Sequence, residues 1–189
     1  QQTVTCVVTH SDNDQCWLVA GSRDCTICVW LLEPSKSYQP VPAEPLHTLY
    51  GHDNAVMCIA VRGDLDIVAS GSDDGTVILY TLRAGTYLRS IDSSSSSPTM
   101  DSLQSQQGPP LSSTSSSSLL QSPLSSGHSG RYQVVWVAVT ANSHVLCYYS
   151  SGALASFSIN GKCLACTVVR DELKAFCLSR DGRTLITGG

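Results

Sequence analysis

The sequence predicts an all-β chain that forms part of a β-propeller, and two observations lead to this fold class. First, the apolar residues fall in short segments that are rich in Val, Ile, Thr, Tyr and Leu and are bounded by Gly, Asp, Asn, Ser or Pro. No segment shows the apolar period of a helix over about 11 residues. Second, the segments recur with a period of about 40 residues, the length of a four-stranded propeller blade.

Each short segment is expected to form one strand. In chain order, the predicted strands are 4–8, 16–22, 26–32, 46–51, 56–61, 66–72, 76–82, 87–91, 132–139, 144–149, 154–159, 162–169, 174–179 and 184–189. The segment 33–45 between the third and fourth strands contains four prolines. Because proline lacks the backbone N–H that a sheet requires, this segment is predicted to be a loop.

The repeats define the blades. Residues 20–30 (AGSRDCTICVW) align with residues 70–80 (SGSDDGTVILY) at an offset of 50, and the proline-rich loop 33–45 accounts for the excess over 40. Residues 151–157 align with 74–80 at an offset of 77, which falls to 38 once the segment 92–130 is left out. Residues 185–188 align with 68–71 at an offset of 117. The chain is therefore expected to supply about three and a half four-stranded blades of a larger ring.

A serine-rich segment separates the second and third blades. The segment 92–130 contains 17 serines, no aromatic residue and two charged ones. Such a composition cannot bury enough apolar surface to offset the entropy of ordering, so a disordered insert is predicted. Ser97 and Ser122 each precede proline and are candidate phosphorylation sites; the alternative is a passive spacer. The predicted organisation is two blades in 1–91, the insert in 92–130, and one blade plus half of the next in 131–189.

Composition excludes several function classes. The 189 residues carry a formal net charge of −4, and the lysines and arginines are not clustered, which argues against nucleic-acid binding. We find no apolar run of transmembrane length and no signal-peptide pattern. The nine cysteines are scattered through apolar runs, so reduced thiols are expected. A start without Met and an end at two glycines indicate a fragment of a longer protein.

Two levels of family resemblance follow from these residues. Gly51-His52, then SGSDDGTV, then an aromatic residue at the end of the third strand resemble a WD repeat, although Tyr80 and Phe157 replace the usual Trp. The stretches GSRDCTICVW, LYGHDNAVMCIAVRGDLDIVASGSDDGTVILYTLRAGTYLRSI, FSINGK and LSRDGRTLITGG resemble the WD-repeat region of BEACH-domain proteins of the neurobeachin and LPS-responsive beige-like anchor type. The serine-rich insert departs from that pattern.

The WD resemblance implies a structural hydrogen-bond network in the second blade. His52, Ser70, Asp74 and the aromatic Tyr80 would tie the loop before the blade to its second and third strands. Tyr80 lacks the indole N–H of the usual Trp, so one hydrogen bond is expected to be missing. In the first blade, Asp24 and Trp30 are the matching network residues, but Ala20 replaces the serine.

Catalytic and metal sites are not predicted. His52, Ser70 and Asp74 are also the residue types of a hydrolase triad, but no Gly-x-Ser-x-Gly motif surrounds Ser70. The pairs Cys25/Cys28 and Cys163/Cys166 invite a zinc or redox interpretation. Residues three apart on a strand face opposite ways, and the pairs fall in different blades, so neither is expected to bind a metal. No cofactor motif is present.

The resemblance implies a non-catalytic scaffold for protein–protein interaction in vesicle and membrane trafficking. Its expected partners are proteins that bind the propeller loops, with no nucleic acid, and membrane association would be indirect, through the rest of the protein. The expected location is cytoplasmic and peripheral to intracellular membranes. One alternative is a propeller that recruits substrates to a complex such as a ubiquitin ligase, and a more remote one is a serine hydrolase.

Overall fold

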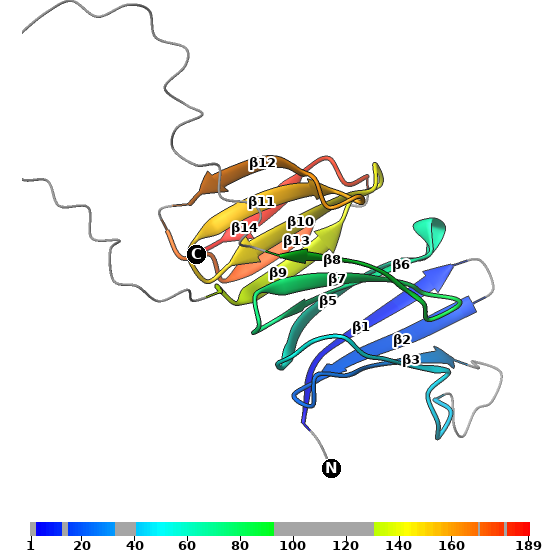
Figure 1. Cartoon of the computed structure of the whole chain (residues 1–189). Helices are drawn as coiled ribbons and strands as arrows, with labels where there is room; N and C mark the ends of the chain where they lie inside the picture. Colours follow the sequence, from blue (N-terminus) through cyan, green and yellow to red (C-terminus); the bar gives the residue numbers. More distant parts are fainter. Residues whose placement is uncertain (1–2, 13–14, 33–40, 93–130, 170, 180) are drawn as a thin grey trace, which may run out of the picture. The chain divides into compact units, whose positions relative to one another are not determined.

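The computed structural model describes residues 3–12, 15–32, 41–92, 131–169, 171–179 and 181–189, all of which belong to one compact unit. These residues form three four-stranded antiparallel sheets and one two-stranded sheet (Figure 1). The first sheet consists of β1 (Val4–Asp12), β2 (Gln15–Ser22), β3 (Ile27–Leu32) and β4 (His47–Leu49). The second consists of β5 (Val56–Arg62), β6 (Ile67–Ser72), β7 (Thr76–Thr81) and β8 (Tyr87–Asp92).

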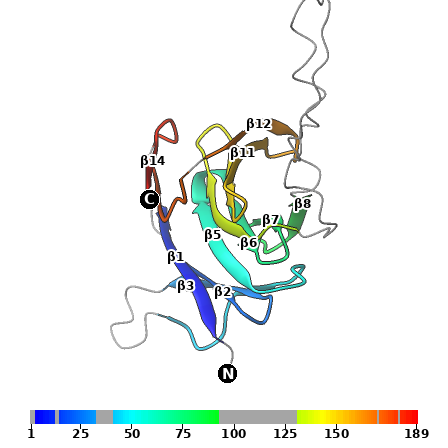
Figure 2. The same ribbon diagram turned by 90° about the vertical axis from the view of Figure 1, so that its left-hand side faces the viewer.

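The third sheet consists of β9 (Val134–Val139), β10 (His144–Tyr149), β11 (Ala153–Ser158) and β12 (Cys163–Val168), and the two-stranded sheet of β13 (Ala175–Leu178) and β14 (Leu185–Gly188). Each four-stranded sheet is a meander, in which strands adjacent in the chain pair with one another, as Figure 2 shows for β5, β6 and β7. These sheets confirm the predicted all-β class and the predicted three and a half blades. A 3₁₀ turn, η1 (Gly63–Leu65), links β5 to β6. The described residues contain no helix that could cross a membrane.

The tight turn between the second and third strands recurs in each four-stranded sheet. Cys25, Gly75 and Gly152 occupy matching positions and have backbone φ angles of 70°, 81° and 82°. Glycine adopts this left-handed conformation without steric cost, whereas Cys25 adopts it with a side chain. The shared geometry supports the sequence offsets of 50 and 77 that define the repeat.

Glycine on the second strand lets the next sheet approach closely. A Cβ atom on Gly21 of β2 would lie 2.6 Å from Val56 Cγ1, and one on Gly71 of β6 would lie 2.4 Å from Val134 Cγ1. Val56 and Val134 are the first residues of β5 and β9. Two successive sheet–sheet joints are therefore built by the same glycine–valine contact.

Each of these joints encloses an apolar cluster. The cluster between the first two sheets contains Trp17, Val19, Ile27, Val29, Leu49, Val56, Ile59, Val68, Ile78, Tyr80 and Leu82. The cluster between the second and third sheets contains Cys58, Ile67, Ala69, Val77, Leu79, Ile91, Val134, Val137, Val139, Val145, Cys147, Tyr149, Ala155 and Phe157. Full burial of one Val, Leu or Ile side chain contributes about 1.5–3 kcal/mol, so these clusters hold successive sheets together.

The joint to the two-stranded sheet uses aromatic side chains instead. Phe176 of β13 stacks on Trp136 of β9 with ring centroids 4.9 Å apart, and it lies 4.9 Å from the ring of Tyr148 of β10. The hydroxyl of Tyr148 also accepts a hydrogen bond of 3.3 Å from the backbone N–H of Leu173. These contacts anchor β13 to the third sheet.

Several strand ends differ from the predicted ones. β1 continues to Asp12 because its polar residues after Val8 still pair with β2, as in the pair His10–Trp17. β4 ends at Leu49, and Gly51 after it has a φ of 142°, so the predicted strand 46–51 is shortened. Asp92, placed in the insert by its composition, is the last residue of β8.

Two predicted features fall largely outside the described residues. They are the proline-rich loop, of which only 41–45 is described and contains no strand, and the serine-rich insert after Asp92, with Ser97 and Ser122. The predicted disorder of that insert therefore stays a prediction.

Candidate functional site

The structure brings His52, Ser70 and Asp74 together inside the second sheet. His52 lies in the connection between β4 and β5, Ser70 in β6, and Asp74 in the turn between β6 and β7. His52 Nε2 lies 2.8 Å from Ser70 Oγ, and His52 Nδ1 lies 3.2 Å from Asp74 Oδ2. Because a carboxylate only accepts, Nδ1 of the neutral ring carries the hydrogen, and Nε2 then accepts from the Ser70 hydroxyl.

Asp74 is the centre of this network. Its Oδ2 accepts a hydrogen bond of 2.9 Å from the backbone N–H of Asp53, and its Oδ1 accepts from the backbone N–H and the hydroxyl of Thr76 at 2.7 and 2.5 Å. Burial by itself raises the pKa of the Asp74 carboxyl. The hydrogen bonds from His52, Thr76 and Asp53 outweigh burial and hold this pKa well below its ordinary value. The carboxylate therefore stays charged and fixes the loop to the turn.

Tyr80 lies in the same region, but its hydroxyl does not bond to His52, Ser70 or Asp74. Its hydroxyl donates a hydrogen bond of 3.0 Å to the carbonyl oxygen of Tyr50, two residues before His52. Burial raises the pKa of Tyr80 to about 12, so the hydroxyl keeps its proton. Besides its contact with His52, Ser70 Oγ lies 3.4 Å from the carbonyl oxygen of Ile78 in the neighbouring strand β7. The loop is thus held at Tyr50 by Tyr80 and at His52 by Ser70 and Asp74.

The first sheet contains only the turn of this network. Asp24 Oδ1 accepts from the backbone N–H and the hydroxyl of Thr26 at 2.9 and 2.5 Å, and its own N–H donates to Ser22 Oγ at 3.3 Å. Among the described residues, no hydrogen bond joins Asp24 to Trp30, which is half-buried in β3 opposite Leu18. The two predicted residues therefore do not act together.

The site residues predicted from the sequence do not include the serine and threonine residues that bond to Asp24 and Asp74 in the turns. Ser72 accepts from the backbone N–H of Asp74 at 3.1 Å, and Thr76 donates to the carboxylate, as Ser22 and Thr26 do around Asp24. The signal was present in the sequence, because Ser-x-Asp-x-Thr occurs at 22–26 and again at 72–76.

The network is closed to solvent. Ser70 has no exposed surface, the His52 side chain is fully buried, and the Asp74 side chain is 8% exposed. A hydrolase needs a nucleophile that a substrate carbonyl can reach, together with donors for the developing oxyanion. The geometry instead satisfies buried polar groups and orders the loop 50–53.

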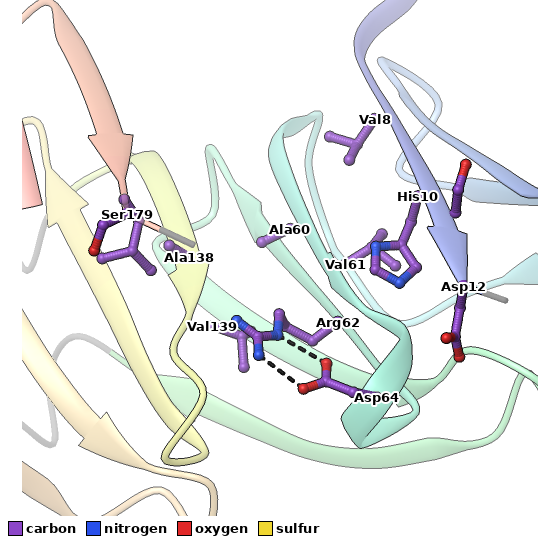
Figure 3. A pocket seen from close by; sticks show the side chains of 12 residues that line it. Val8, His10, Asp12, Ala60, Val61, Arg62, Asp64, Ala138, Val139 and Ser179 are labelled. Carbon is purple, nitrogen blue, oxygen red and sulfur yellow. Dashed lines mark hydrogen bonds and ion pairs between the residues drawn. The ribbon is translucent and has the colours of Figure 1, made fainter. Parts of the chain in front are cut away.

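A second candidate site is a hollow of about 540 Å³ near the ends of β1, β5 and β9 and at Leu178 and Ser179 (Figure 3). Its apolar wall includes Val8, Ala60, Val61, Ala138, Val139 and Leu178, and its polar side includes His10, Asp12, Arg62, Asp64 and Ser179. These residues come from four segments far apart in the chain. A volume in this range suits a small ligand or a few side chains of a protein partner.

Ion pairs order the polar side of this hollow. Arg62 donates two hydrogen bonds to Asp64, of 2.9 and 2.8 Å. Arg83, from the turn after β7, donates to Asp12 Oδ2 of the first sheet and to Asp66 Oδ1 of the second, both at 3.2 Å. The two sheets are therefore joined at this rim by one guanidinium shared between two carboxylates.

A third feature is a hollow of about 840 Å³ at the opposite ends of β1, β5 and β9, the first strands of the three four-stranded sheets, which we call the inner strands. It is lined by Thr3, Val4, Thr5, Arg23, Asn54, Ala55, Met57, Asp73 and Gln133. Both ends of the inner strands thus offer concave surfaces.

The cysteines are all described, and none of the nine is paired in a disulfide. Cys25 lies in a turn and Cys28 in β3, whereas Cys163 and Cys166 lie in β12. Burial raises the pKa of Cys147 to about 12, and that of Cys58 is also raised. Within the described ranges, no three His, Cys, Asp or Glu side chains gather in a way that could hold a metal ion.

Comparison with known proteins gives a consistent assignment. A family model of the neurobeachin beta propeller domain matches residues 1–111. The chain is 31% identical over 204 residues to BEACH domain-containing protein B of Arabidopsis thaliana, an alignment that covers 100% of this chain and 6% of that protein. It is 23% identical over 195 residues to a putative neurobeachin homolog of Caenorhabditis elegans, covering 98% of this chain and again 6% of the relative.

Solved structures support the fold. The crystal structure of RRP9 WD40 repeats superposes with a TM-score of 0.65 at 16% sequence identity, covering 100% of this chain and 46% of that one. The structure of U3-55K gives the same values. At this identity the likeness concerns the WD40 propeller fold alone.

Proposed function

The chain belongs to the neurobeachin β-propeller family, and from this premise we propose that it is a non-catalytic docking module of a BEACH-domain scaffold protein. The observation that carries the proposal is the closed network of His52, Ser70 and Asp74. These side chains, which resemble a catalytic triad in type, are used to fix a surface loop. What the chain offers to other molecules is its turns, its loops and the concave ends of its inner strands.

The cellular role proposed for the whole protein is scaffolding in vesicle and membrane trafficking. This part of the proposal rests on family membership, because the chain spans 6% of the length of the Arabidopsis relative. The partners would be proteins that bind the propeller loops, without nucleic acid. Membrane association would be indirect, through other parts of the protein, and the location would be cytoplasmic and peripheral to intracellular membranes.

The experiment is proximity labelling in cells that express the full-length protein, compared with a version from which residues 1–189 are deleted. Proteins that are labelled only with the intact chain, and that include components of one trafficking compartment, would support the docking role. If deletion leaves the set of labelled proteins unchanged, the chain is not a docking module.

The serine hydrolase alternative has one favourable observation, the 2.8 Å contact between Ser70 Oγ and His52 Nε2. It is tested separately with a fluorophosphonate probe on the full-length protein. We expect no labelling of Ser70, because this residue has no exposed surface. Labelling that disappears in Ser70→Ala would replace the scaffold proposal with an enzymatic one.

A further inference from the structure

We infer that the hollow at the ends of β1, β5 and β9 is a docking site for a lysine or arginine side chain presented by an extended segment of a partner protein. The inference rests on the proposed docking function and adds to it the place and chemical class of the contact. Three properties of the hollow carry it: its charge balance, its apolar wall and the imidazole of His10, which faces it (Figure 3).

The charge balance favours a cation. Among the described residues that line the hollow, Asp12 and Asp64 are acidic and Arg62 is basic, which leaves one net negative charge. Arg83 and Asp66 at the same rim are one cation and one anion, so including them leaves this balance unchanged. A ligand with one positive charge would therefore neutralise the described part of the rim, whereas an acidic ligand would add to its charge.

Asp12 has the free acceptor that such a cation needs. Its Oδ2 accepts from Arg83 at 3.2 Å, while its Oδ1 has no hydrogen-bond partner in the described part of the chain. Arg62 occupies both oxygens of Asp64 with single hydrogen bonds, and each of these oxygens retains a further lone pair. A Lys ammonium or an Arg guanidinium at the rim can thus bond to Asp12 without breaking either existing ion pair.

The wall of the hollow matches the stem of a long basic side chain. Val8 from β1, Ala60 from β5, and Ala138 and Val139 from β9 form its apolar lining. Lys and Arg carry three or four methylene groups that pack on such surfaces while the charged end remains at a polar rim. Asp or Glu side chains are too short to use this wall and have the wrong charge.

His10 supplies a donor for the backbone of the same segment. The backbone N–H of Gly63 donates to His10 Nε2 at 3.1 Å, so the hydrogen of the neutral ring is on Nδ1. Among the described residues, this Nδ1–H has no hydrogen-bond partner. A peptide carbonyl next to a basic side chain would satisfy it, so the hollow recognises a cation and a neighbouring carbonyl together.

The test uses the full-length protein and four synthetic peptides, acetyl-Gly-X-photoleucine-Gly-amide, with X as Lys, Arg, norleucine or Glu. After irradiation, the crosslinked residues are mapped by mass spectrometry. The Lys and Arg peptides are expected to label β1 and β5 around the hollow about threefold to fivefold more than the other two, as suits one partly exposed ion pair. Asp12→Asn is expected to remove that preference. The matched control Asp53→Asn, an exposed residue in the loop before β5, is expected to preserve it.

Asp12→Asn also loses the ion pair with Arg83, so a second variant leaves every charge in place. Ala60→Leu enlarges an apolar side chain of the hollow and is expected to abolish labelling there by all four peptides. Equal labelling by the norleucine or Glu peptide, labelling unaffected by Ala60→Leu, or no crosslink at the hollow would overturn the inference. Crosslinks elsewhere on the chain would reject this site and leave the docking function standing. Whether the chain has a docking function at all is tested separately, by the proximity labelling.

Discussion

Asp92 and Arg131 form an ion pair of 3.3 Å between the last residue of β8 and a residue just before β9. These two residues flank the segment 93–130, so the points at which the described chain stops before that segment and resumes after it are held close together. The cost of closing a flexible loop rises by only about 0.6 kcal/mol per doubling of its length. For the disordered insert that the composition predicts, the length should therefore matter little to folding.

We predict that residues 93–130 are dispensable for folding. Replacing them with a short Gly-Ser turn in the full-length protein should change the free energy of unfolding of the β5–β12 region by less than about 1 kcal/mol. Hydrogen–deuterium exchange of peptides from β6 and β10 measures this. A large loss of protection in both strands would show that the serine-rich segment packs on the sheets.

Asp74→Ala should destabilise the second sheet by about 1–3 kcal/mol, because it removes the acceptor of the N–H groups of Asp53 and Thr76 and leaves His52 Nδ1 only its 3.1 Å contact with the Thr76 hydroxyl. Exchange protection of peptides covering 50–57 and 70–80 measures the loss. Asp24→Ala is the matched control, since Asp24 makes the same turn contacts with Thr26 and has no histidine partner among the described residues. Equal losses in the two variants would show that the His52 contact contributes nothing.

The contribution of Asp74 to the free energy of unfolding should decrease as the pH falls. Its pKa is lower in the folded state than in the unfolded chain, so the folded state binds fewer protons. The stabilisation is fully present above a pH of about 4 and is lost as the pH falls further. Pulse proteolysis in urea at several pH values should show that the difference in the free energy of unfolding between wild type and Asp74→Asn becomes smaller as the solution is acidified. A difference that stays constant down to pH 3 would contradict this linkage.

The sequence predicts the fold well because the repeat is local. The turn residues Cys25, Gly75 and Gly152 share one backbone geometry, and their spacing fixes the second and third strand of every four-stranded sheet. His52, Ser70 and Asp74 could be placed together for the same reason, since each occupies a defined position of the repeat. The Ser-x-Asp-x-Thr pattern carries the information for the turn contacts of Ser72 and Thr76.

Other features depend on contacts that no local pattern records. The partner of the Tyr80 hydroxyl is the Tyr50 carbonyl, whose position depends on the conformation of the loop around Gly51. The hollow brings His10 together with Arg62 and residues of β9 that are more than a hundred positions away from His10. None of these residues belongs to a repeated motif, so only the three-dimensional arrangement of the inner strands reveals the site.

Tyr80→Phe should loosen the loop before β5. The substitution keeps the buried ring but removes the 3.0 Å hydrogen bond to the Tyr50 carbonyl, which is worth about 0.5–1.5 kcal/mol. Hydrogen–deuterium exchange of the backbone amides of residues 50–54 should become faster by the factor that corresponds to this loss of free energy. The exposed Tyr87 contacts the Tyr80 ring edge-on, with the two ring centroids 6.2 Å apart. Tyr87→Phe is therefore the control and should leave exchange in this loop unchanged. An unchanged loop in Tyr80→Phe would show that the hydrogen bond does not order it.

Gly71→Ala should strongly destabilise the joint between the second and third sheets. The new Cβ would lie 2.4 Å from Val134 Cγ1 and 2.7 Å from Cys58 Sγ, so β9 would have to move away, and overpacking of this kind costs about 1–3 kcal/mol. Exchange protection of β6 and β9 in full-length wild type and Gly71→Ala makes the comparison direct, and equal protection in both would show that the close approach at Gly71 is not required for the joint.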